Sequence, residues 1–166
     1  MKEILIDKVT LNIGVGETGE KLNKAVKLLA HLTGEKPVQT TSKSRIPTWA
    51  IRPGLPIAAK VTLRKEKAKK ILQRLFVAIN NKLSSKKFDT TGNFSFGVKE
   101  YLEIPEAKYD PEIGIIGLEA AVTLKRKGYR VKERAIKKAK VGKKHQVSKD
   151  EAIQFIQQEF KIEVTP

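Results

Sequence analysis

The sequence predicts an α+β fold with a mostly antiparallel sheet, one face covered by helices and the other face polar. Several segments alternate apolar and polar residues with a period of two, as strands with one buried face do. Other segments repeat apolar residues at the spacing of amphipathic helices. Polar faces on the strands favour antiparallel pairing, because strands of parallel sheets are usually buried on both faces.

The first predicted strand and helix lie on either side of a glycine-rich turn. Residues 8–13 alternate, and the polar face of this strand carries Lys8 and Asn12. Apolar residues then recur at helical spacing over residues 22–32, and Gly34 is expected to end the helix.

The next strand and helix repeat this arrangement. Residues 57–64 alternate, and the polar face of the strand carries Lys60, Thr62 and Arg64, which makes it basic. Residues 66–83 have one apolar stripe and a lysine-rich opposite side, which predicts a helix with one buried face.

Three further elements complete the predicted order strand, helix, strand, helix, strand, strand, helix. Alternation predicts strands over residues 98–104, with Tyr101 pointing outward, and over residues 116–125. A capping-box sequence that begins at Ser148 predicts a C-terminal helix over about residues 149–160.

Composition limits the class of protein. With 40% hydrophobic residues spread along 166 positions, the chain can bury a core, and we expect a single domain over residues 1–166. The lack of cysteine excludes disulfides and Cys-containing zinc sites, and the sequence has no spacing typical of metal ligands, so we expect neither metal nor cofactor. No apolar run reaches the length of a membrane span, and the N-terminus lacks the pattern of a signal peptide.

The net charge of +16 is concentrated in two regions. Lys125 to Lys144 contains 11 basic residues and one acidic residue, a density that is self-repelling without a polyanionic partner. Residues 36–65 contain seven basic residues and no acidic residue. Such surfaces suit phosphate backbones, whereas an anionic membrane usually selects basic segments with more exposed aromatic or leucine side chains. The expected partner is a nucleic acid and not a membrane.

Gly14 to Gly19 matches the G-x-G-x-x-G pattern of dinucleotide-binding folds and lies between a predicted strand and a predicted helix. A nucleotide-binding enzyme that uses these glycines is therefore one alternative. The polar-faced strands argue against the buried parallel sheet of that fold, and a tight turn is the favoured role of the glycines. The histidines, His31 and His145, lack a nearby nucleophile motif, and we expect neither to be catalytic.

Residues 92–99 are similar to the aromatic strand with which RNA-recognition motifs stack bases. The match is loose, because no basic residue precedes Gly92 and because Asn93 separates that glycine from the first aromatic residue. Packing between turn glycines is therefore the expected role of Phe94 and Phe96.

Together with Y-D-P at residues 109–111 and G-I-I-G at 114–117, four motifs follow one another along the chain and span most of it. They are K-V-T-L-N-I-G-V-G-E at residues 8–17, T-G-E-K-P-V at 33–38, the stretch from I-R at 51–52 to K-V-T-L-R at 60–64, and G-N-F-S-F-G-V-K-E at 92–100. Together these motifs resemble the L5 family of large-subunit ribosomal proteins, in bacterial naming. The basic extension from Arg126 and the helix after Ser148 are similar to the archaeal and eukaryotic members.

The resemblance implies a non-enzymatic, cytoplasmic and ribosome-bound protein that holds 5S rRNA in the central protuberance. By motif, Lys8, Asn12 and Thr62 fall at positions with which the family contacts 5S rRNA. Many members have glutamine where this chain has Glu35, and a carboxylate there would repel phosphate. The family also places a flexible loop against the P-site tRNA, and residues 42–56 are the candidate for that loop.

The expected partners are 5S rRNA, other large-subunit rRNA, P-site tRNA and neighbouring ribosomal proteins of the central protuberance. The candidate rRNA-binding residues are Lys8, Asn12, Lys60, Thr62, Arg64, Lys125, Arg126, Arg130, Lys132, Arg134, Lys137 and Lys138. The candidate tRNA contacts are Lys43, Arg45, Trp49 and Arg52. A general basic nucleic-acid-binding protein or RNA chaperone is the other alternative.

Overall fold

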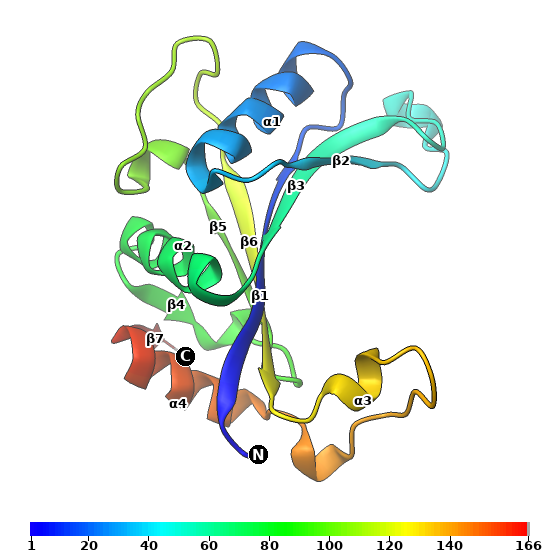
Figure 1. The fold of residues 1–166 in the computed structure, drawn as a ribbon. Coiled ribbons are helices and arrows are strands. Elements are labelled where there is room, and N and C mark those ends of the chain that lie inside the picture. Colours follow the sequence, from blue (N-terminus) through cyan, green and yellow to red (C-terminus); the bar gives the residue numbers. More distant parts are fainter. Residues whose placement is uncertain (166) are drawn as a thin grey trace.

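A five-stranded sheet forms the centre of the protein in the computed structural model, which describes residues 1–165 (Figure 1). The strands follow the order β2-β3-β1-β6-β5, and every neighbouring pair is antiparallel. Their bounds are Ile4–Gly14 for β1, Val38–Thr41 for β2, Pro56–Leu63 for β3, Phe94–Val98 for β5 and Leu118–Arg126 for β6. The predicted α+β class with a mostly antiparallel sheet is confirmed.

Helices cover one face of this sheet. The helices α1 (Glu20–Thr33) and α2 (Lys65–Ala78) lie across it, and α4 (Lys149–Phe160) lies on the same side (Figure 1). The short α3 (Arg130–Glu133) belongs to the loop that follows β6. Within residues 1–165 no helix covers the other face, which we call the open face.

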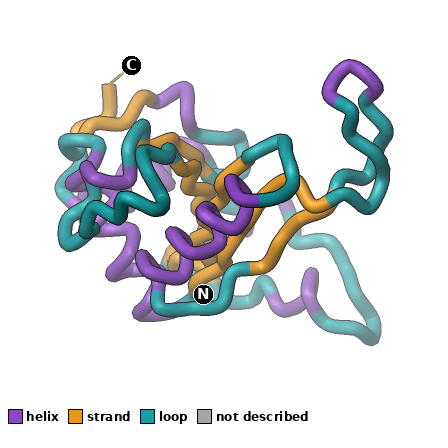
Figure 2. Tube along the Cα trace, turned by 90° about the horizontal axis from the view of Figure 1, so that it is seen from above, coloured by secondary structure: helices purple, strands orange, loops and turns teal. Residues whose placement is uncertain are grey.

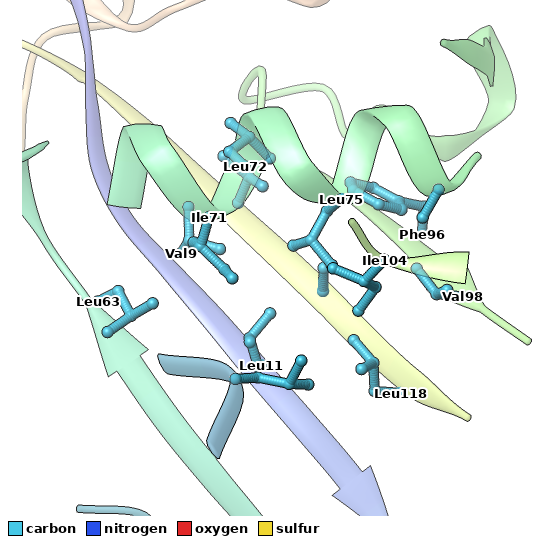
Figure 3. Close-up of a cluster of buried hydrophobic side chains, with 14 of the residues drawn as sticks. Val9, Leu11, Leu63, Ile71, Leu72, Leu75, Phe96, Val98, Ile104 and Leu118 are labelled. Carbon is cyan, nitrogen blue, oxygen red and sulfur yellow. The ribbon is translucent and has the colours of Figure 1, made fainter. Parts of the chain in front are cut away.

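Alternating side chains build the core between the sheet and the helices. Val9 and Leu11 in β1 are fully buried. Figure 3 shows them on the side of β1 that faces α2, from which Ile71 and Leu75 point back toward the sheet. Burial of one such side chain stabilises the fold by roughly 1.5–3 kcal/mol. The same alternation turns the intervening residues of β1 toward the open face.

The helix predicted over residues 66–83 is shorter in the structure. It ends at Ala78, because Asn80 and Asn81 both adopt the left-handed backbone conformation, with φ of 55°. Their backbone N–H groups donate to the carbonyls of Val77 and Phe76 and so satisfy the last helical turn. The chain then forms β4 (Lys82–Ser84), which pairs in parallel with β7 (Glu163–Thr165).

The strand predicted over residues 98–104 is also displaced. It lies at Phe94–Val98, and residues 101–103 form a single 3₁₀ turn. The prediction that Tyr101 points outward is wrong, because its side chain is 1% exposed and its hydroxyl accepts a hydrogen bond from the Asp110 backbone at 3.2 Å. Gly117 permits this path, since a Cβ there would lie 2.7 Å from the carbonyl oxygen of Lys99.

Phe94 and Phe96 occupy the core and do not reach the open face. Both are buried, and their rings stack on Phe76 of α2 with centroid distances of 6.3 and 5.5 Å. The prediction that these phenylalanines pack within the protein is confirmed.

The glycine motif forms the turn between β1 and α1. The N–H groups of Val15 and Gly16 both donate to the carbonyl of Ile57, at 3.0 and 2.9 Å, and Gly16 has a φ of 76° that favours glycine. The preceding strand has antiparallel neighbours on both sides, whereas a dinucleotide-binding fold needs a parallel sheet at this position. The topology therefore supports a structural role for these glycines.

Candidate nucleic-acid interface

The open face carries polar side chains from three neighbouring strands. Asn12 of β1 lies opposite Lys60 of β3 and opposite Glu119 of β6, while Thr10 lies opposite Thr62. Directly opposed side chains of antiparallel strands have Cβ atoms about 4.5–5.5 Å apart, so the register gathers these groups into one patch. The sheet thus brings together Asn12, Lys60 and Thr62, which sequence reasoning assigned to one binding surface.

Two predicted cations at the N-terminal end of β1 surround an acid. A β-bulge between Ile6 and Lys8 makes room for Asp7, whose side chain is 10% exposed. Its Oδ1 atom lies 2.6 Å from Lys125 Nζ and 3.6 Å from Arg64 Nη1. Lys125 is therefore largely neutralised within the protein, whereas the Arg64 side chain remains 58% exposed and accessible to an anion.

Arg126 differs from the other predicted cations. It is 6% exposed on the helix side of β6, and its Nη2 atom lies 2.6 Å from Glu151 Oε1 at the start of α4. The backbone N–H of Ser148 and then the Arg126 guanidinium hold the pKa of Glu151 below its ordinary value. Because Arg126 joins β6 to α4, we leave it out of the interface.

The basic segment leaves the sheet as a loop, residues 127–147, which we call the basic loop. Its predicted ligands, Arg130, Lys132, Arg134, Lys137 and Lys138, are all exposed. Arg134 Nε donates to the carbonyl of Lys137 at 2.7 Å, and the N–H of Ala139 donates to the carbonyl of Val131 at 3.1 Å. The loop therefore has internal order despite its charge.

A tyrosine and a histidine close the base of the basic loop. The Tyr129 hydroxyl donates to the carbonyl of His145 at 3.4 Å and accepts from the backbone of Val147 at 3.2 Å. His145 Nε2 lies 2.9 Å from the carbonyl oxygen of Lys127, and the two rings meet edge to face. These contacts give His145 a positioning role, while His31 lies exposed on α1.

The second acid-free zone forms a hairpin of β2 and β3 with an ordered tip at residues 42–55. Ser42 is 9% exposed, and its hydroxyl donates to the carbonyl of Ser44 at 2.8 Å. Ile46 and Ile51 pair across the tip, which ends in a 3₁₀ turn at Pro47–Trp49. The predicted tRNA contacts Lys43, Arg45, Trp49 and Arg52 are all exposed there, with Trp49 69% exposed.

The hairpin tip and the basic loop extend on the same side of the sheet. Figure 1 shows the tip and the loop that contains α3 on the side away from α2 and α4, and Figure 2 shows the same relation from above. The open face therefore lies between two basic projections. A surface of this shape can follow the backbone of a folded polyanion and neutralise its phosphates.

Sequence reasoning missed a hollow at one end of the open face. It measures about 480 Å³ and contains Asn12 and Glu119, with Lys87 and Lys99 among the side chains around it. The period-two pattern of residues 116–125 places Glu119 on the polar face, so that pattern was a signal for its position. Alternation over residues 98–104 likewise turns Lys99 outward. Lys87 carried no such signal, because it lies in a 3₁₀ turn outside the strands.

Among residues 1–165 no helix has the length and apolar character needed to span a membrane.

Family models match nearly the whole chain. The model described as ribosomal protein L5 matches residues 1–52, and that of the ribosomal L5P family C-terminus matches residues 56–155.

Curated relatives match over nearly the full length of both chains. The large ribosomal subunit protein uL5 of Nanoarchaeum equitans is 56% identical over 165 residues, which cover 99% of this chain and 97% of that protein. Those of Sulfolobus acidocaldarius and Methanosphaera stadtmanae are 46% and 43% identical over 164 residues, or 99% of this chain and 92% and 98% of theirs. The chain therefore belongs to the ribosomal protein L5 family, whose members are structural and non-enzymatic proteins.

Proposed function

We propose that this large-subunit ribosomal protein, bound to the ribosome in the cytoplasm, binds 5S rRNA through its open face and helps to anchor it in the central protuberance. One observation carries the proposal: a polar and basic sheet face lies uncovered between two basic projections. Lys8, Asn12 and Thr62 lie on that face, at the positions where the resemblance to the family implies contact with 5S rRNA.

The two projections have separate roles in this proposal. The basic loop contacts neighbouring large-subunit rRNA, because its exposed lysines and arginines suit phosphates and carry no sequence preference. The hairpin tip contacts the P-site tRNA, where the exposed Trp49 offers an aromatic surface and Arg45 and Arg52 offer charge. Neighbouring ribosomal proteins complete the surroundings.

We propose that the whole chain acts as one RNA-binding unit. The strand β1 belongs to the segment matched by the first family model, whereas β3, β5 and β6 belong to the segment matched by the second. All four lie side by side in one sheet, and their buried side chains share one core. Neither segment has a complete open face by itself.

A matched pair of lysine variants tests the binding face. Lys60→Ala removes one charge from the open face, and Lys70→Ala removes one from the exposed side of α2. We expect Lys60→Ala to weaken binding to 5S rRNA about fivefold in a gel-shift titration, with a smaller effect of Lys70→Ala, because only one of the two charges faces the RNA. Equal losses would favour the alternative of a general polyanion binder.

A further inference from the structure

A carboxylate without an ion-pair partner lies in the hollow at one end of the open face. Glu119 is exposed on β6, and within residues 1–165 no lysine or arginine forms an ion pair with it. Its hydrogen-bond partner is Asn12, whose Nδ2 lies 3.5 Å from Glu119 Oε2. Asp7, by contrast, is neutralised by Lys125 and Arg64. A free carboxylate on a surface that faces phosphates is repulsive unless it accepts hydrogen bonds from the RNA.

The space beside Glu119 is left bare by glycine. Gly97 of β5 lies directly opposite Glu119, and a Cβ on Gly97 would meet no atom nearer than 3.9 Å. Gly117 also borders the hollow, and the hollow's volume of about 480 Å³ lies within the range of small-ligand sites. A flat group can therefore rest on exposed backbone and present its edge to the carboxylate.

The chemistry of the carboxylate selects one base. An ionised carboxylate offers two acceptor oxygens and no donor. The Watson–Crick edge of guanine presents a ring N–H and an amino group side by side, so guanine supplies two parallel donors to the two oxygens. Unpaired bases of RNA loops are commonly recognised on this edge. Lys87 and Lys99, which border the hollow, are placed to contact the phosphates on either side.

We propose that Glu119 is a specificity-determining residue that reads an unpaired guanine of the bound RNA in this hollow. The inference rests on the proposed function, since it concerns the same open face. Base recognition explains why a carboxylate lies on this surface, which electrostatic attraction to RNA alone does not. Phosphate contacts hold the RNA in position, and the carboxylate distinguishes one base from the other three.

Replacement of Glu119 should change RNA affinity in opposite directions, depending on whether the open face acts by charge alone or Glu119 reads guanine. If the face acts only by charge, Glu119→Gln removes a repulsion and tightens binding to every RNA. If Glu119 reads guanine, Glu119→Gln weakens binding to homologous 5S rRNA by about tenfold or more, while the affinity for tRNA stays equal or rises. Glu163→Gln, on β7 and away from the open face, is the matched control and should leave 5S rRNA binding unchanged.

A second variant tests the hollow without a change of charge. Gly97→Val fills the space beside Glu119, and strands tolerate β-branched residues well. We expect it to reduce affinity for 5S rRNA as Glu119→Gln does. Gln39→Val is the control, because it introduces valine at an exposed position of β2. The register partner of Gln39 is the buried Ala59, so this position does not belong to the open face.

The base is identified by footprinting with kethoxal, which modifies the ring nitrogen and the amino group of unpaired guanines. The wild-type protein should protect one guanine of 5S rRNA, and Glu119→Gln should expose it again. If the wild type does not distinguish 5S rRNA from tRNA, the proposed function fails first. If it does distinguish them, but Glu119→Gln binds 5S rRNA as tightly or leaves every protected guanine protected, the guanine inference alone is overturned.

Discussion

Arg126 Nη2 lies 2.6 Å from Glu151 Oε1, and this contact joins the last residue of β6 to the first turn of α4. The two side chains differ in environment, because Arg126 is 6% exposed and the Glu151 side chain is 44% exposed. Glu151 also accepts a hydrogen bond from the backbone N–H of Ser148 at 3.0 Å, which completes the capping box predicted for this helix.

This difference in burial predicts unequal effects of the two single replacements. Glu151→Gln keeps the capping geometry but leaves the buried guanidinium without its ionic partner, which should cost about 2–3 kcal/mol. Arg126→Met leaves a carboxylate that water can reach, and we expect a loss of about 1 kcal/mol. Urea unfolding measures both free energies, and a larger loss for Arg126→Met would contradict this account of the pair.

Stability should fall on acidification, partly through Glu151. The Ser148 backbone N–H and the Arg126 guanidinium lower the pKa of Glu151 in the folded protein from its ordinary value of 4.5. Folding thus favours the ionised form of Glu151. The contribution of this form to folded-state stability is present above the ordinary pKa and is lost as the pH falls through the lower pKa of the folded state. Thermal unfolding between about pH 7 and pH 3 should show a shallower acid decline for Glu151→Gln than for the wild type.

The Tyr129 hydroxyl should stabilise the base of the basic loop. Tyr129→Phe removes the acceptor of the Val147 N–H, and Val147 is 1% exposed. The loss should be about 1–2 kcal/mol, because a buried donor is left without a partner. Hydrogen exchange at the Val147 amide should become faster in the variant. Unchanged exchange would indicate that the loop is held by its other contacts.

Replacement of Asn12 should affect one RNA and spare others. Asn12→Ala removes a group that can bond to RNA and also the hydrogen-bond partner of Glu119. We expect a loss of about 1–3 kcal/mol in binding to 5S rRNA and little change with tRNA. Asn23→Ala on the exposed side of α1 is the control. Equal losses for 5S rRNA and tRNA would remove the basis for a selective site on the sheet.

The basic loop should contribute affinity without selectivity. Replacing Lys137 and Lys138 with alanine removes two exposed charges. Binding to every RNA should weaken, and the slope of log affinity against log salt should decrease by about one to two units. Lys24→Ala with Lys70→Ala removes the same charge from α1 and α2 and should leave the slope nearer to that of the wild type. A slope unaffected by the Lys137 and Lys138 replacements would exclude the loop from the RNA contact.

Sequence pattern predicts the elements whose side chains alternate over many residues. The first strand and the strand that contains Glu119 follow from period two, and their register then gathers the open face. The strands β2, β4 and β7 have three or four residues each, too few to show a period of two. β4 and β7 also pair with each other from distant parts of the chain.

Tertiary contacts explain the remaining differences. Tyr101 is buried because the chain can pass close to Gly117, and Arg126 is buried because Glu151, 25 positions later, returns to meet it. The local sequence pattern does not predict the burial of either side chain. The hollow beside Glu119 also depends on tertiary structure, because glycines of β1, of β5 and of the segment before β6 border it together.

The most direct test of the central claim is a gel-shift titration of the wild-type protein against homologous 5S rRNA, with tRNA as competitor, at about 0.1 and 0.3 M salt. We predict a complex that persists at the higher salt and resists excess tRNA, because the open face adds selective contacts to the electrostatic attraction. A complex that dissolves at the higher salt, or that tRNA displaces equally well, would contradict a dedicated 5S rRNA site.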